Sequence, residues 1–215
     1  MTVMTDWDTR AEAYRTSATH AGGADLDRVI EWCEPAEGVL AIDVATGGGH
    51  VARRLREAGC RVTTVDPAPG MQPDVIAHAE YLPFADGSFE VAVNRYAAHH
   101  FDDVEEAIRE LARVSRDRVV VEDLLFQDEA CEQAELLRDP THRRNYTEAE
   151  WRALFQGAGL TIEAVEIQKV DHPLEEWIAR TGCEGEDAER VRELLAPRVV
   201  DGIWTNEVII LKGKK

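Results

Sequence analysis

The segment 39–55, with the sequence VLAIDVATGGGHVARRL, constrains the fold more than any other part of the chain. A strand-like apolar run breaks into three consecutive glycines, and apolar residues then resume at helical spacing. The chain must therefore leave a strand and turn sharply into a helix whose first N–H groups point at whatever lies above the strand. Gly47, Gly48 and Gly49 supply the positive φ and the missing Cβ that let a ligand approach the backbone closely.

Strand-like segments alternate with amphipathic helical segments along the rest of the chain, a pattern typical of βαβ units around a parallel sheet. We expect strands at 38–45, 61–66, 74–77, 90–95 and 118–125, and two later strands, at 160–170 and 205–213, that complete an antiparallel edge. Helices are predicted at 49–59, 102–115, 128–139, 147–159, 173–181 and 186–196. The predicted fold class is α/β: a single-domain, doubly wound, Rossmann-like fold with a mostly parallel seven-stranded sheet.

The composition limits which partners and which cellular compartment are expected. The net charge of −18 comes from 42 acidic and 24 basic residues, and no basic stripe could follow a phosphate backbone, so nucleic acid is not an expected partner. No stretch approaches the roughly 18 apolar residues of a membrane span, and the N-terminus has no signal pattern, so a cytoplasmic protein without membrane contact is expected. The cysteines have neither metal nor redox spacing, which favours reduced thiols and no metal site: Cys33, Cys60, Cys131 and Cys183.

An acidic residue at the end of the second predicted strand indicates the kind of ligand. Asp66 lies nineteen residues after Gly47, where a carboxylate can accept hydrogen bonds from two ribose hydroxyls. A nucleoside bound at the carboxyl edge of the sheet is therefore expected. Gly47, Gly49 and Ala52 also fit the dinucleotide fingerprint, so these residues alone leave NAD and other adenosine compounds open, and a turn that binds no ligand remains the alternative.

Several motifs around this turn resemble those of one enzyme family. The segment AIDVATGGGH resembles the D-x-G-x-G-x-G signature of class I S-adenosylmethionine-dependent methyltransferases, with Ala45 where the first glycine usually stands. The segments AEYLPFADGSFEVAV, NRYAAHHFDDVEEAIRELARV, LRDPTHRRNYTEAEWRALFQGAGL and AYRTSATHAGGADL are similar to later and earlier parts of the family. Together they cover most of the chain, and they resemble most closely the methyltransferases of the ubiquinone and menaquinone biosynthesis type.

The resemblance implies a role for individual residues. Asp43 would orient the methionine end of S-adenosylmethionine, and the amides near Gly47 and Gly49 would approach its carboxylate. Asp66 would bind the ribose, and Met71 would pack on the adenine. The full set of implied cofactor-binding residues is Asp43, Ala45, Thr46, Gly47, Gly49, Asp66, Met71, His78, Ala79, Asn94, Tyr14 and His20. Asp43 is also compatible with a buried acid that holds loop amides, Met71 with core filler and Asn94 with a turn residue.

The resemblance also implies an arrangement of the chain. Residues 1–35 would form a helical lid that includes Tyr14, Ser17 and His20, residues 36–125 the cofactor-binding half, and residues 126–215 the substrate-side helices and last strands. The family has a full helix after the ribose-binding acid, but here only PAPGMQP intervenes, whose three prolines forbid a regular helix. One wall of the adenine pocket is then missing or replaced by another segment or subunit, which is compatible with a homodimer. In addition, His78 replaces the acid that usually holds the adenine amino group.

Two adjacent histidines follow the fourth predicted strand. His99 or His100 is the preferred catalytic base, since an imidazole with a pKa near ~6.5 can accept the proton that leaves an oxygen or nitrogen nucleophile. The alternative is structural: one histidine faces the core and the other caps the next helix with Asp102. His142, Arg143 and Tyr146 are candidates for a substrate pocket, although the same segment also fits an exposed connector.

The predicted function is methyl transfer from S-adenosylmethionine to a small-molecule acceptor. The alternative is a protein that keeps the fold and binds a ligand or partner without methyl transfer, suggested by the shortened adenine region. An NAD-dependent oxidoreductase ranks third.

Overall fold

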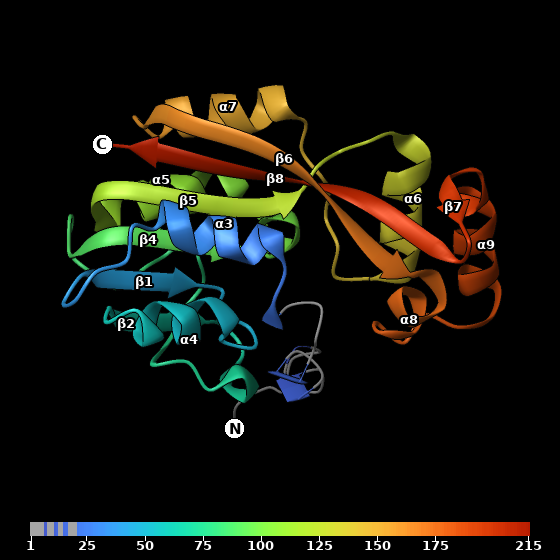
Figure 1. Cartoon of the computed structure of the whole chain (residues 1–215), viewed down its shortest axis with the longest axis horizontal. Coiled ribbons are helices and arrows are strands. Elements are labelled where there is room, and N and C mark those ends of the chain that lie inside the picture. The colour runs from blue at the N-terminus through green and yellow to red at the C-terminus, as the bar shows by residue number, and fades with distance from the viewer. Residues whose placement is uncertain (1–6, 8–10, 13–14, 17–20) are drawn as a thin grey trace.

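The computed structural model describes residues 7, 11–12, 15–16 and 21–215. These residues include one mixed sheet with the strand order β3-β2-β1-β4-β5-β8-β6, and the short strand β7 pairs with β8 (Figure 1). Neighbouring strands from β3 to β5 are parallel, β8 is antiparallel to β5, and β6 is antiparallel to β8. The strands are β1 (Leu40–Val44), β2 (Arg61–Asp66), β3 (Val75–Ile76), β4 (Phe89–Arg95), β5 (Ser115–Leu124), β6 (Thr161–Pro173), β7 (Val199–Val200) and β8 (Ile203–Lys214).

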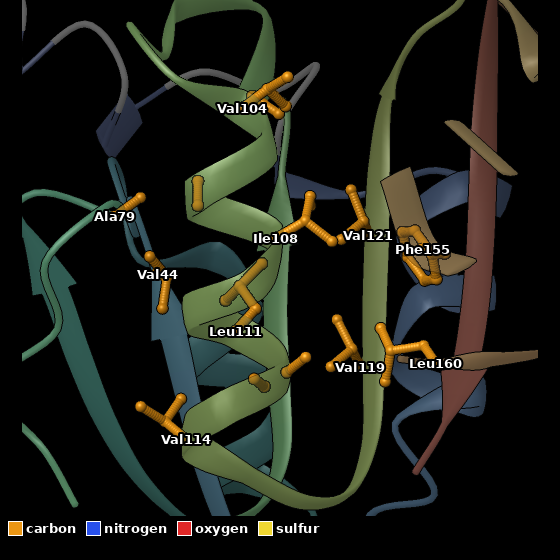
Figure 2. Close-up of a cluster of buried hydrophobic side chains, with 14 of the residues drawn as sticks. Val44, Ala79, Val104, Ile108, Leu111, Val114, Val119, Val121, Phe155 and Leu160 are labelled. Carbon is orange, nitrogen blue, oxygen red and sulfur yellow. The ribbon is translucent and has the colours of Figure 1, made fainter. Parts of the chain in front are cut away.

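Helices cover both faces of the sheet. One face packs against α3 and α4, and the other against α5 and α7. Figure 2 shows Ile108 of α5 and Phe155 of α7 close to Val121 of β5. Neighbouring strand residues divide between the two clusters, so that Ala41 faces α3 and α4 whereas Ile42 faces α5 and α7. The helices are α3 (Ala24–Trp32), α4 (His50–Glu57), α5 (Val104–Val114), α6 (Glu129–Arg138), α7 (Glu148–Gly157), α8 (Leu174–Ala179) and α9 (Gly185–Leu195), with 3-10 turns η1 (Pro69–Met71), η2 (Ala98–His100) and η3 (Ala196–Arg198).

A third apolar cluster lies beyond the end of β5. Strands β6 and β8 have 13 and 12 residues, and their far ends continue past β5, where α6, α8, α9 and β7 gather around them (Figure 1). Trp177 of α8 and Trp204 of β8 pack there with ring centroids 6.1 Å apart. We call α6, α8, α9, β7 and these strand ends the distal lobe.

Local signals define where two of the helices begin. Asp103 caps α5 by accepting a hydrogen bond from the Glu106 amide at 3.0 Å. Thr147 and Glu150 form a reciprocal capping box at the start of α7. No helix among the described residues is long and apolar enough to cross a membrane.

The predicted fold class is confirmed, and all seven expected strands are present. The sheet also contains β7, a two-residue strand too short to leave a periodic signal. The segment between β2 and β3 is short as expected, and its only regular structure is the single turn η1. Three cysteines, Cys33, Cys60 and Cys131, are buried thiols, and Cys183 is half-buried.

Candidate active site

A cavity of about 420 Å³ opens at the carboxyl edge of the sheet. The chain passes from β1 to β2 and β3 on one side of β1, and then crosses to β4 on its other side. The cavity therefore lies where a doubly wound sheet reverses its strand order. Its size falls within the range of roughly 300–1,000 Å³ that is usual for small-molecule sites. The predicted site residues that line it are Asp43, Ala45, Thr46, Gly47, Asp66, Met71, His78, Ala79 and His100.

The turn between β1 and α4 has the backbone conformation that its glycines predict. Gly47 and Gly49 have φ angles of 51° and 73°, a region that other residues enter only at a cost. The Gly47 N–H donates to Asp66 Oδ2 at 3.0 Å, and the Gly49 N–H donates to the Thr46 carbonyl at 2.9 Å. Ala45 also has a positive φ, 54°, although it is not glycine. A ligand carboxylate at this turn would therefore have to share the Gly47 and Gly49 amides with these protein acceptors.

Asp43 is buried at the end of β1, with 2% of its surface exposed. Its Oδ2 accepts hydrogen bonds from Thr46 Oγ1 at 2.6 Å and from the Ala52 amide at 3.1 Å. Burial raises the pKa of Asp43 to about 6, against the pull of these two hydrogen bonds. Asp43 thus holds the turn together, as the structural alternative predicts, and it also lines the cavity.

Asp66 connects the turns that follow β1 and β2. Its Oδ2 accepts from the Gly47 amide, and its Oδ1 accepts from the Ala68 amide at 2.9 Å. The carboxylate is buried, with 6% exposed, and lines the cavity. The backbone amides hold both carboxylate oxygens in place. A ligand group that donates a hydrogen bond to Asp66 therefore meets a carboxylate whose orientation is already fixed.

The short segment after β2 is covered by the N-terminal part of the chain. Ala68 and Met71 form a small apolar cluster with Ala11 and the half-buried Trp7. Arg15 Nη1 donates to the Gly70 carbonyl at 2.7 Å. Residues of the same chain therefore pack beside the segment where one wall of the adenine pocket was predicted to be missing or replaced. Tyr14, Ser17 and His20, predicted for a lid, lie outside the described residues.

Of the other predicted cofactor-binding residues that the structure describes, Gly49 and Asn94 do not line the cavity. Asn94 Nδ2 donates to the Val44 carbonyl at 2.8 Å, so its side chain joins the ends of β4 and β1. Ala79 is buried and His78 is exposed at the cavity wall.

The two histidines occupy different environments. His99 Nδ1 contacts Asp123 Oδ1, and its backbone N–H donates to Asp123 Oδ2 at 2.9 Å. Burial opposes the charged imidazolium, but the Asp123 carboxylate outweighs it, so the pKa of His99 is raised. His100 Nδ1 lies 3.0 Å from the Thr141 carbonyl, and burial together with the charge of His99 holds the pKa of His100 well below its usual range. His100 lines the cavity and His99 does not.

The candidates from the HRRNY segment also separate. Arg143 lines the cavity and pairs with Asp102 at 2.8 Å. His142 Nε2 lies 3.1 Å from Glu132 Oε1, and Tyr146 packs edge-on against Trp151 with ring centroids 5.6 Å apart. His142 and Tyr146 thus contact α6 and α7 respectively.

Arg95 and Tyr96 are cavity residues that the sequence-based prediction missed. The Arg95 guanidinium is buried between two carboxylates, contacting Asp25 of α3 and Glu122 of β5, the latter at 2.5 Å. Burial raises the pKa of Glu122 to about 8 despite Arg95, whereas Arg95 outweighs burial at Asp25 and lowers its pKa. An arginine at the end of a strand-like segment was the available signal, since a cation that becomes buried there requires an anionic partner.

Comparison with known proteins agrees with this architecture. The methyltransferase domain family matches residues 42–121. The uncharacterized methyltransferase YcgJ of Bacillus subtilis is 32% identical over 220 residues, covering 91% of this chain and 85% of YcgJ. The crystal structure of the YcgJ protein superposes with a TM-score of 0.80 at 26% identity and covers 89% of this chain and 97% of that chain. Demethylmenaquinone methyltransferase of Chlorobaculum parvum is 34% identical over 84 residues, covering 34% of this chain and 35% of that protein.

The doubly wound sheet, with the glycine turn at its switch point, defines a class I methyltransferase fold. The chain belongs to the S-adenosylmethionine-dependent methyltransferase family, and it is a methyltransferase. The likeness to quinone-biosynthesis members is confined to about a third of the chain, so the narrower subgroup has only loose support.

Proposed function

We propose that this protein binds S-adenosylmethionine in the cavity at the carboxyl edge and transfers its methyl group to a small-molecule acceptor. One observation carries the proposal: Asp43 and Asp66 flank the glycine turn, and both carboxylates line a cavity large enough for a nucleoside. A carboxylate is a suitable partner for ribose hydroxyls and for the cationic amino group of a methionine moiety. The residues present therefore fit the cofactor.

The side chains of this chain would divide the work of binding. Asp66 would accept hydrogen bonds from the ribose, and Asp43 would face the amino-acid end. Met71, with Ala68 and Trp7 behind it, would give the adenine an apolar surface that excludes water. When bound, S-adenosylmethionine supplies an electrophilic methyl group on a sulfonium centre.

The protein's part in the reaction is then mainly positioning and exclusion of water. An acceptor with a protonated oxygen or nitrogen would also need a base. His100 lines the cavity and its lowered pKa keeps it neutral and able to accept a proton, whereas His99 does not line this cavity and has its pKa raised by Asp123. We therefore assign the base within the predicted pair to His100.

Calorimetric titration tests this function directly. S-adenosylmethionine and its demethylated product should each give saturable heat, and NAD should give little. Mass spectrometry of small molecules released from the native protein is an independent check, with the same nucleosides as the expected outcome. Saturable binding of NAD without binding of S-adenosylmethionine would contradict the proposal and support an oxidoreductase.

Cofactor binding without turnover is the result that the non-transferring alternative predicts. Single-turnover assays on an oxygen or nitrogen acceptor separate methyl transfer from binding alone, because only a methyltransferase turns over. Comparing the wild type with His100→Gln then tests the assigned base. Loss of a general base should lower the rate by ~10²-fold or more at unchanged cofactor affinity.

A further inference from the structure

The segment 139–143 follows α6 and passes beside η2 at the wall of the cavity. Thr141 and Arg143 line the cavity together with His100. Two hydrogen bonds join the segment to η2: the Arg143 N–H donates to the His99 carbonyl at 2.8 Å, and His100 Nδ1 lies 3.0 Å from the Thr141 carbonyl. The proposed base is thus held by the part of the chain that leaves the distal lobe.

The contact with Thr141 determines which nitrogen of His100 carries the proton. A carbonyl oxygen can only accept, so Nδ1 is the donor, and Nε2 of the neutral ring keeps a lone pair. Burial and the charge of His99 lower the pKa of His100, which keeps the ring neutral at neutral pH. Within the described part of the chain, Nε2 has no hydrogen-bond partner, and it is not among the polar atoms that are both unpaired and fully enclosed.

Asp139 fixes the hydroxyl group of Thr141 beside the same ring. The Asp139 side chain is buried, with 1% exposed, and its Oδ1 accepts from the Thr141 amide at 3.0 Å and from Thr141 Oγ1 at 2.7 Å. The single hydroxyl hydrogen is therefore directed at Asp139. Thr141 Oγ1 also lies 3.2 Å from His100 Nδ1, and with its hydrogen engaged it can only accept there.

The ring of His100 is also held by packing. The Trp7 ring contacts it edge-on, with centroids 4.8 Å apart and an interplanar angle of 74°. Turning the imidazole over would place Cδ2 instead of Nδ1 against the carbonyl and hydroxyl of Thr141, and both polar contacts would be lost. The contacts therefore favour one orientation and one tautomer of the ring.

We propose that Thr141, anchored by Asp139, is a positioning residue for His100: it holds the proton on Nδ1 and leaves the Nε2 lone pair for the methyl acceptor. As the acceptor takes the methyl group and the electron pair of the broken carbon–sulfur bond stays on sulfur, Nε2 would remove the proton from the acceptor's O–H or N–H. Nδ1 keeps its own proton, so the Thr141 carbonyl also stabilises the imidazolium that forms. The tautomer follows from contacts within this chain, and its catalytic consequence rests on the proposed methyl transfer.

Two-bond ¹H–¹⁵N spectra of the full-length protein, labelled with ¹⁵N-histidine, distinguish the two neutral tautomers. The His100→Gln variant identifies the signals of His100, because only these disappear. A histidine ring without a fixed partner populates both tautomers. At neutral pH, His100 of the wild type should instead be found almost entirely with its proton on Nδ1.

Thr141→Val keeps the shape of the side chain but removes the hydroxyl that contacts His100 and Asp139. The ratio of the Nδ1–H to the Nε2–H tautomer should fall about tenfold, the usual size of one hydrogen bond. Thr141→Ser keeps the hydroxyl and should restore the ratio. Thr205→Val is the matched control, since it removes an equivalent exposed bond to Asp171 away from the cavity and should leave the ratio unchanged.

Melting temperatures and single-turnover rates separate positioning from a structural role. The rate on an oxygen or nitrogen acceptor should fall with the tautomer ratio in Thr141→Val and recover in Thr141→Ser, at unchanged cofactor affinity. A Thr141→Val variant that melts at a lower temperature but keeps the wild-type tautomer ratio overturns the inference.

A wild-type protein in which His100 carries its proton on Nε2 also overturns the inference, and calorimetric binding of S-adenosylmethionine would then leave the proposed function intact. An Nδ1–H tautomer that depends on Thr141 in a protein without affinity for S-adenosylmethionine has the opposite meaning. It would support the positioning of the ring and contradict the proposed function.

Discussion

The turns that follow β1 and β4 meet at the same cavity but are built differently. Each begins with a non-glycine residue in the left-handed region, Ala45 at φ 54° and Tyr96 at φ 53°. After β1 the chain presents mainly backbone, because Gly47 and Gly49 leave the surface open. After β4 it presents large side chains fixed by charge, since Tyr96 Oη donates to Asp25 Oδ2 at 3.2 Å and Arg95 lies beneath.

This difference indicates a division of roles. A turn made of backbone adapts its amides to a ligand whose chemistry is shared by the whole family. A turn made of side chains depends on partners elsewhere in the fold, here α3 and β5, and its chemistry can be specific to this protein. Substitutions in the two turns should therefore change the stability of the protein for different physical reasons.

The largest effect is expected at the base of the β4 turn. Arg95→Met leaves two buried acidic side chains, Asp25 and Glu122, without their cation, which should reduce the free energy of unfolding by about 3–5 kcal/mol. Urea denaturation measures the loss. Arg109→Met on the exposed face of α5 is the control and should change stability by no more than ~0.5 kcal/mol. A similar small change for Arg95→Met would show that the β4 turn does not depend on its ion pairs.

At the β1 turn, Asp43→Asn should raise the stability of the ligand-free protein above pH 6, whereas Arg95→Met lowers it. The pKa of Asp43 rises from 3.8 to about 6 on folding, so the native state binds more protons than the unfolded state between these values. Its contribution to stability is therefore complete below pH 3.8 and is lost as pH rises through about 6.

The asparagine keeps an oxygen for Thr46 and Ala52 but has no charge to bury. Above pH 6 it should be more stable than wild type, with about 3 kcal/mol as the ceiling set by the pKa shift. The advantage should vanish near pH 4, and cofactor affinity should fall. Thermal melts of both proteins from pH 4 to pH 8 check the profile. A variant that is less stable than wild type by the same amount at every pH would contradict the buried charge of Asp43 as the cause.

The smallest effect compares the two left-handed residues themselves. Ala45→Gly relieves a backbone cost of roughly 1–2 kcal/mol but adds unfolded-chain entropy of about 0.4–1 kcal/mol. A net gain of about 0.5 kcal/mol is expected, visible as a melting-temperature rise of about 1–2 °C.

Tyr96→Gly gains the same backbone relief but loses the hydrogen bond to Asp25 and the Arg95 contact, whose guanidinium lies 4.6 Å from the ring centroid. It should therefore lower the melting temperature. If both glycine variants shifted it in the same direction, the contrast between the two turns would be lost.

The sequence was sufficient for features that depend on local chemistry. The positions of the strands follow from alternating apolar segments, and the glycines and Asp66 identify the cavity edge because their spacing within one βαβ unit fixes their position. Partners distant in sequence were not predictable in this way. Arg95 meets Asp25 across 70 residues, and no local pattern links them.

The short segment after β2 shows the same limit. Its prolines correctly exclude a helix, but periodicity does not indicate that Trp7 and Ala11 would pack over Met71. The histidine pair was recognised as chemically suitable, yet which of the two lines the cavity depends on Asp123 and Thr141, which approach from other elements.

The proposed cofactor site lies at the β1 turn, where Asp66, the carboxylate that links this turn to β2, would bind the ribose. Calorimetric titration of S-adenosylmethionine into Asp66→Asn tests it most directly, with Asp86→Asn as the control, since Asp86 is exposed and precedes β4 at the opposite edge of the sheet. Removing a charged acceptor from ligand hydroxyls should weaken binding by about 1–3 kcal/mol, whereas the control should bind like wild type. A folded Asp66→Asn variant with wild-type affinity would contradict the claim and move the ribose to another part of the cavity.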